Sequence, residues 1–94
     1  MNYLVKPDNQ SFTLYPNPVI ERLFYISALP LIPHGQKVYV EIMDLTGKIV
    51  QTEIMTLATL AEPFVLNENL IGKNLIIVRI TTNSQVSVQK LLLN

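Results

Sequence analysis

The sequence predicts an all-β protein, a sandwich of about seven short antiparallel strands. Three observations support this prediction. Apolar residues alternate with polar residues in short runs, turn-forming residues separate these runs, and no segment has the period of a long helix. The length of 94 residues fits one domain with one core.

The composition supports a folded domain and excludes several classes of partner. Hydrophobic residues make up 49% of the chain and charged residues 15%, which is too apolar for disorder. Seven Lys plus Arg balance seven Asp plus Glu, so no net field attracts nucleic acid. The longest apolar run, 75–78, is far shorter than the roughly 18 residues that span a bilayer. We therefore expect neither a nucleic-acid partner nor membrane insertion.

Seven segments read as strands. They are expected at 12–15, 23–29, 38–44, 49–56, 64–66, 75–82 and 86–93, each between turn formers. The last two form a hairpin across a turn at Asn83 and Ser84. Short strands at this spacing predict an immunoglobulin-like β-sandwich.

The clearest alternation lies in the third segment. Because successive side chains of a strand point to opposite faces, one set meets the core and the other meets solvent. The residues expected in the core are Val38, Val40 and Ile42, and those expected in solvent are Tyr39, Glu41 and Met43.

The strongest turn signal is Asp44-Leu45-Thr46-Gly47-Lys48. Asp opens a type I turn with its side chain, and Gly accepts the left-handed geometry that follows. A calcium loop is the alternative, but it needs several oxygen ligands, and here Asp44 and Thr46 offer too few. The segment predicts a tight hairpin.

The inventory of reactive side chains predicts no catalytic site, no metal site and no cofactor. His34 is the single histidine and lies on a proline-rich loop, and cysteine is absent. The three glycines flank no serine at nucleophile-elbow spacing and form no phosphate-binding cluster. The carboxylates are scattered along the chain. We therefore expect no enzyme.

Four segments, in this order, resemble the type A C-terminal sorting domain of type IX secretion, also called Por secretion. They are Tyr15-Pro16-Asn17-Pro18, then 38–50 with its Asp-x-x-Gly turn, then a glycine before 76–80, and finally Lys90-Leu91-Leu92-Leu93. The resemblance spans about 12–94. It predicts that 12–94 form the sorting domain and that 1–11 are a linker or an added N-terminal strand.

The resemblance implies a non-catalytic export signal on a covalently fused passenger protein. The passenger crosses the periplasm, reaches an outer-membrane type IX translocon and a shuttle protein, and ends at the cell surface or in the medium. A sortase-like peptidase commonly removes the domain while it attaches the passenger to a surface glycolipid.

The resemblance also assigns positions in this chain. Pro16, Asn17 and Pro18 match the N-terminal motif of the family. Asp44, Gly47 and Lys48 match its central hairpin, Gly72 its turn before the penultimate strand, and Lys90 with Leu92 its terminal strand. The chain departs from the pattern after Gly72, where two residues are inserted and an aromatic is lost, and at its end, where Asn94 follows the leucines.

The terminal strand is the expected recognition element. An edge strand has unpaired backbone groups that can add to a partner's sheet, and Lys90 would be its charged marker. The alternative is that Lys90 only solubilises the edge.

A different function on the same fold is a structural or adhesive immunoglobulin-like module, either a spacer or a carbohydrate binder. An exposed aromatic platform would favour the binder, and Phe24 and Tyr25 point to opposite faces, so one of them is a candidate. A lysine-bearing terminal edge strand would favour the export signal.

Overall fold

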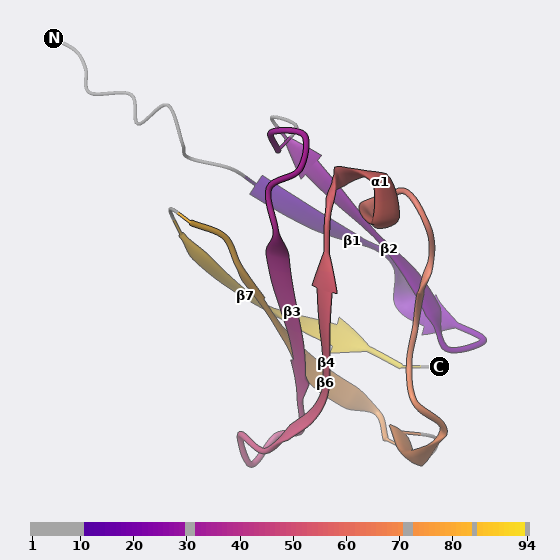
Figure 1. The fold of residues 1–94 in the computed structure, drawn as a ribbon. Helices are drawn as coiled ribbons and strands as arrows, with labels where there is room; N and C mark the ends of the chain where they lie inside the picture. The colour runs from indigo at the N-terminus through magenta and orange to yellow at the C-terminus, as the bar shows by residue number, and fades with distance from the viewer. Residues whose placement is uncertain (1–10, 30–31, 71–72, 84, 94) are drawn as a thin grey trace, which may run out of the picture.

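The computed structural model confirms the all-β sandwich and describes residues 11–29, 32–70, 73–83 and 85–93 (Figure 1). Seven strands follow one another, with a short helix α1 and a 3-10 turn between β4 and β6. The elements are β1 (Ser11–Ile20), β2 (Leu23–Leu29), β3 (Val38–Met43), β4 (Ile49–Met55), α1 (Leu57–Leu60), β5 (Phe64–Val65), η1 (Glu68–Leu70), β6 (Leu75–Thr81) and β7 (Val86–Leu92). The prediction for residues 1–11 falls mostly outside the described residues and stays a prediction.

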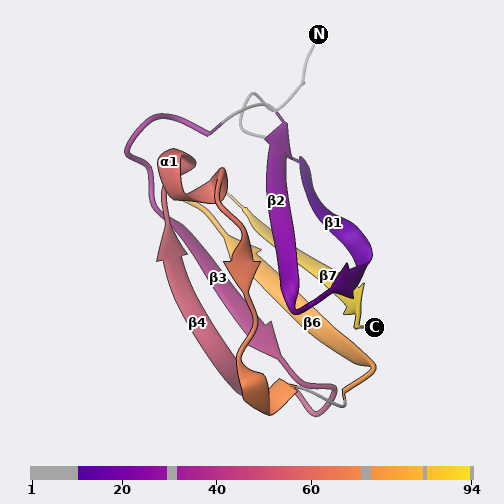
Figure 2. The same ribbon diagram turned by 90° about the vertical axis from the view of Figure 1, so that its right-hand side faces the viewer.

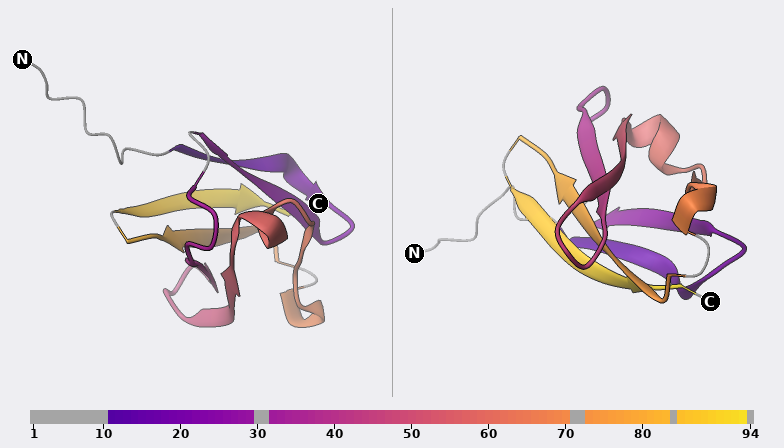
Figure 3. Two further views of the ribbon diagram at one scale, coloured as in Figure 1. Left: turned by 45° about the horizontal axis from the view of Figure 1, so that its top comes forward. Right: turned by 90° about the horizontal axis from the view of Figure 1, so that it is seen from below.

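The strands form two facing sheets. One has the order β1-β2-β5 and the other the order β4-β3-β6-β7, and every neighbouring pair is antiparallel. Figure 2 shows the sheet of β1 and β2 lying against the sheet that contains β6 and β7, and the left panel of Figure 3 shows them as separate layers. This is the order of an immunoglobulin-like sandwich whose fourth strand pairs with the third instead of joining the first sheet.

The first strand is longer than expected, because it continues through both prolines to Ile20. Up to Tyr15 its residues pair in regular register with β2, the register then shifts, and Ile20 pairs with Leu23. The prolines lie in this bulge, where the ladder with β2 is interrupted and their missing N–H groups cost no bond. The peptide bonds that precede Pro16 and Pro18 are cis.

The core lies between the sheets and is built from alternate residues of each strand. Phe24 from one sheet and Ile42, Ile76, Ile80 and Leu91 from the other are completely buried. Phe24 also packs its ring on Phe64, with ring centroids 4.9 Å apart. The inward set predicted for the third strand is confirmed, since Val38, Val40 and Ile42 have no exposed surface.

The outward prediction is wrong for Met43, which is only 9% exposed. Met43 lies on the outer side of its sheet, with Ile49 of β4 on one side and Ile77 of β6 on the other. Two large cross-strand neighbours cover it. The sequence pattern gave its face correctly but could not give these neighbours.

The side of the sandwich between β4 and β5 is closed by side chains, because no backbone ladder joins the two strands. The Gln51 amide donates to the Val65 carbonyl (2.9 Å) and accepts from the Asn67 N–H (2.9 Å). Near the other end of β4, α1 covers the gap with the buried Leu60. One glutamine therefore replaces two backbone hydrogen bonds along this edge.

We predict that Gln51→Ala lowers the free energy of unfolding by about 1–2 kcal/mol, because two hydrogen bonds are lost together. Urea unfolding of the purified domain measures the change. Thr52→Ala, on the same strand but facing the other way, is the matched control and should cost less. An equal loss in both variants would contradict the role given to Gln51.

Candidate functional site

The terminal strand β7 lies at the edge of the four-stranded sheet and carries the strongest recognition prediction. It pairs with β6 over its whole length in one uninterrupted register. The Leu93 N–H points toward β6 and donates to the Asn74 carbonyl, so the backbone groups of Leu92, Lys90 and Val88 point the other way. Among the described strands, none pairs with β7 on that side between Val86 and Lys90. Edge position is therefore confirmed for β7.

The end of β7 is held by the proline motif of β1. The side-chain oxygen of Asn17 accepts the outward N–H of Leu92 at 3.0 Å. Two residues later Val19 forms a parallel bridge with Leu93, and Val19 is only 2% exposed. The bulge thus carries β1 from its partner in the first sheet to the edge of the second. It brings together two regions that the sequence matched separately to the family, the N-terminal motif and the terminal strand.

A second link joins the same two strands nearer the beginning of β7. The Gln89 amide points inward and donates to the Phe12 carbonyl of β1 at 2.7 Å. Gln89 and Asn17 had not been expected to act together, because Gln89 belongs to no motif. Only the three-dimensional pairing of β1 with β7 gives either amide its partner.

The central hairpin has the geometry predicted for it. The Gly47 N–H donates to the Asp44 carbonyl (3.0 Å), and Gly47 has the left-handed φ of 90°. The Asp44 carboxylate accepts from the Thr46 N–H (2.9 Å), the Thr46 hydroxyl (2.5 Å) and the Lys48 N–H (3.1 Å). One carboxylate oxygen thus accepts three hydrogen bonds and the Asp44 carbonyl a fourth, which accounts for Asp44, Gly47 and Lys48 structurally.

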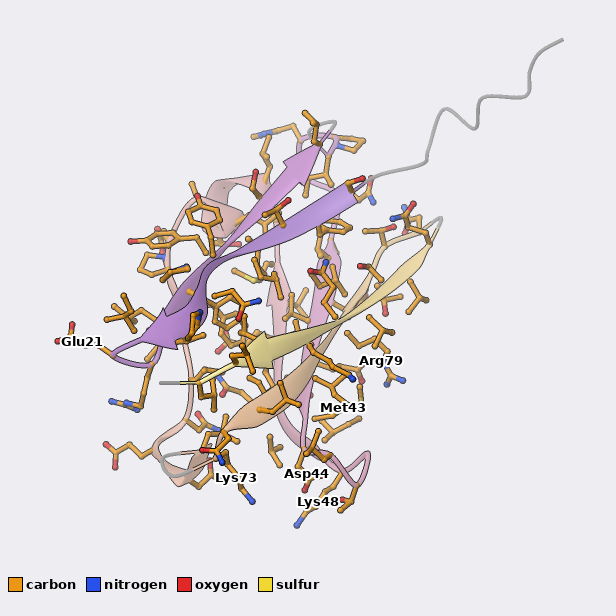
Figure 4. All side chains as sticks on the ribbon, turned by 180° about the vertical axis from the view of Figure 1, so that it is seen from behind. Glu21, Met43, Asp44, Lys48, Lys73 and Arg79 are labelled. Carbon is orange, nitrogen blue, oxygen red and sulfur yellow. The ribbon has the colours of Figure 1, made fainter. Side chains whose placement is uncertain are left out.

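The Asp44 turn and the end of β7 at Leu92 lie at the same end of the four-stranded sheet. A hollow of about 340 Å³ separates the Asp44 turn from Lys73, Asn74 and Leu75. Leu75 pairs with Leu92 in the next strand, so the segment before β6 lies between the two. Figure 4 shows Asp44, Lys48 and Lys73 gathered at this end. Gly72 lies outside the described residues.

Charges on the outer side of the four-stranded sheet are few. Arg79 and Glu41, cross-strand neighbours on β6 and β3, form the one ion pair among the described residues, with Nε and Oε1 2.6 Å apart. The Arg79 hydrogen bond holds the pKa of Glu41 below its usual value. Lys90 is exposed on the same side, next to Ile77.

The described side chains form no cluster of catalytic or metal-binding groups. His34 is exposed on the loop before β3, and no group of three metal-binding side chains occurs in the described part of the chain. None of the described helices is long and apolar enough to cross a membrane. Of the two aromatic candidates, Phe24 is buried, while Tyr25 is partly exposed and stacks on Tyr15 at 5.5 Å. The hollow beside this stack is about 200 Å³, smaller than usual ligand pockets.

We predict that Asn17→Ala exposes the Leu92 amide and destabilises the domain by about 1 kcal/mol, because one hydrogen bond between the sheets is lost. Amide exchange at Leu92, measured by NMR, should become faster. Asn17→Asp keeps an acceptor at this position and should keep the protection. Asn69→Ala, at an exposed position of η1, is the control, and equal acceleration there would contradict the assignment.

A second prediction concerns Asp44, whose pKa is lowered chiefly by the Thr46 hydroxyl and further by the Lys48 and Thr46 N–H groups and by Lys73, while desolvation opposes this. A carboxyl with a lowered folded pKa stabilises the fold above its ordinary value of 3.8. That contribution disappears as the pH falls through the folded pKa. Asp44→Asn should therefore be less stable than the parent at pH 7 and approach it below pH 3.8. Thermal unfolding against pH measures this, with Glu62→Gln as control; a constant difference would contradict it.

Comparison with known proteins agrees with the matched motifs. The model of the secretion system C-terminal sorting domain family matches residues 13–94. Among solved structures, the crystal structure of dimeric latent PorU from Porphyromonas gingivalis is similar, with 25% identity over 95% of this chain and a TM-score of 0.52. The chain corresponds to 10% of that PorU chain, and no curated protein matches it. Because the family model covers most of the sequence, this protein belongs to the type IX secretion C-terminal sorting domains, non-catalytic signals for translocation across the outer membrane.

Proposed function

We propose that the domain exports a covalently fused passenger by presenting the edge of β7 to a receptor of the type IX system. The observation that supports this most directly is the family match over residues 13–94. The passenger would cross the periplasm, meet the outer-membrane translocon and its shuttle protein, and reach the cell surface or the medium. Removal of the domain by a sortase-like peptidase belongs to the same proposal.

The geometry of β7 supports recognition by strand addition. The outward backbone groups of Val88 and Lys90 have no strand partner in the described fold, and an extended segment of a receptor can bond to them. Lys90 adds a positive charge beside these groups. Asn17 accepts the next outward N–H of the strand, that of Leu92, so the free edge has a defined end.

Deletion of the terminal strand cannot test this proposal cleanly. Leu91 is completely buried, and Leu93 bridges to β1, so loss of β7 would remove core as well as edge. A point substitution at an exposed position separates recognition from folding. Lys90 is suited to this because its side chain is exposed and makes no ion pair with any described residue.

We predict that residues 1–94, fused behind a signal peptide and a fluorescent reporter in a Bacteroidetes host, direct the reporter to the surface or medium only when the translocon is present. Lys90→Glu should lower export by about tenfold, since a like-charge contact at a recognition site costs more than 1.4 kcal/mol. Lys90→Arg should export normally, and Lys37→Glu, with the same change in net charge, is the control.

Thermal unfolding of each purified domain must show that folding is unchanged. Periplasmic retention of the parent fusion would refute the sorting function in this chain. Normal export of Lys90→Glu would refute the role of Lys90 and leave it as a solubilising edge charge.

A further inference from the structure

The outer surface of the four-stranded sheet carries apolar side chains on all four strands, on either side of a polar row formed by Thr52, Glu41 and Arg79. Antiparallel sheets with one solvated face usually present polar residues there. Here most outward positions carry large apolar side chains, and we call these residues the apolar face: Tyr39, Met43, Ile49, Ile54, Leu75, Ile77, Val86, Val88 and Leu92. The opposite surface, over β1 and β2, presents hydroxyl groups at Ser11, Thr13, Tyr15, Tyr25 and Ser27, with an exposed apolar residue, Leu29, at one end.

The most exposed members of the apolar face lie on both edges of the sheet. Ile54 on β4 is 58% exposed, and Val86 and Val88 on β7 are 58% and 60% exposed. These side chains add nothing to the core, because they point away from it. Large apolar side chains that stay exposed on one surface of a soluble protein point to an interaction site there.

The charges on this face indicate what covers it. Glu41 is the one carboxylate among its outward positions, and Arg79 already pairs with it. The remaining charge is Lys90, which is positive and lies beside Val88 and Leu92 on β7. The same face of a second copy offers no free carboxylate to this lysine, because its one carboxylate, Glu41, is already paired with Arg79. Charge complementarity therefore favours a different protein, one that brings an acidic residue.

The size of the face argues in the same direction. Four strands about 4.8 Å apart, each of six or seven residues rising about 3.3 Å, cover roughly 400 Å². Stable interfaces bury about 800 Å² on each partner, so this face alone is too small for a stable dimer. Backbone pairing along the free edge of β7 adds to the contact without needing more apolar area.

We infer that the apolar face and the free edge of β7 together receive an extended strand of a partner protein, with alternate apolar residues and an acidic residue beside Lys90. The added strand continues the sheet, and the partner's body covers the apolar residues. This inference rests on the proposed export function, since it specifies the receptor surface that β7 meets.

The test uses substitutions, at exposed positions only, that replace a methyl or ethyl group by a hydroxyl group. Val86→Thr, Val88→Thr and Ile54→Thr are combined in one export fusion. The matched control combines Ile20→Thr and Val65→Thr, whose parent side chains are 56% and 51% exposed but lie elsewhere. Threonine keeps the branched shape and the strand preference.

Export of the face variant should fall by about tenfold or more, because each methyl group lost from a buried contact weakens binding by about fourfold. The control should export like the parent, and both should unfold at the parent's temperature. If the parent exports and the face variant exports equally, the inference is wrong while the export function stands. If the parent itself stays in the periplasm, the export function fails first.

A photo-crosslinking residue at position 88 of the exporting fusion identifies the occupant. We expect a crosslinked segment in which apolar residues alternate and an aspartate or glutamate is present, and no such product from position 20. A crosslink to a second copy, or to a segment without an acidic residue, would overturn the inference. Sedimentation of the purified domain gives an independent check, since a dimer abolished by the threonine substitutions would assign the face to self-association.

Discussion

The division of β1 between the two sheets is the constraint on which this fold depends. Its first half completes the sheet with β2, and its bulge brings Asn17 and Val19 to the end of β7. Without this crossing, the sheets would be joined on that side only by apolar contact and by Gln89. The proline motif is therefore structural: it places a bulge where one strand must serve two partners.

The same crossing makes the proposed recognition site depend on the folded state. The Asn17–Leu92 hydrogen bond joins residues 75 positions apart, and the Gln89–Phe12 bond joins residues 77 positions apart. Contacts this distant are characteristic of sandwiches with high contact order, which fold slowly because loop closure precedes most of the gain from packing. A receptor that binds β7 beside the bulge of β1 binds a surface that exists only in the folded domain.

Much of the fold could be predicted because local signals agree with it. The alternation of Val38, Val40 and Ile42 and the Asp44 turn each need only neighbours in sequence. The burial of Met43 could not be predicted, because it depends on cross-strand neighbours. The hydrogen bonds of Gln51 could not be predicted either, because its partners lie in a backbone segment far away in the sequence. The matched residues could be found by resemblance to the family. That Asn17 lies against Leu92 could not be predicted, because this contact depends on the strand order and on the bulge in β1.

The two sheets are joined along two sides, and the contacts on these sides are of different kinds. On one side, backbone and amide contacts between β1 and β7 close the sandwich; on the other, Gln51 and α1 close it with side chains. Regions held by fewer buried contacts open at lower free energy than the whole domain unfolds. Partial unfolding should therefore begin along the β4–β5 side, where the two-residue strand β5 opens before the long β3–β4 pair and proteases gain access. The β6–β7 pair, which contains the edge proposed for recognition, stays closed longest.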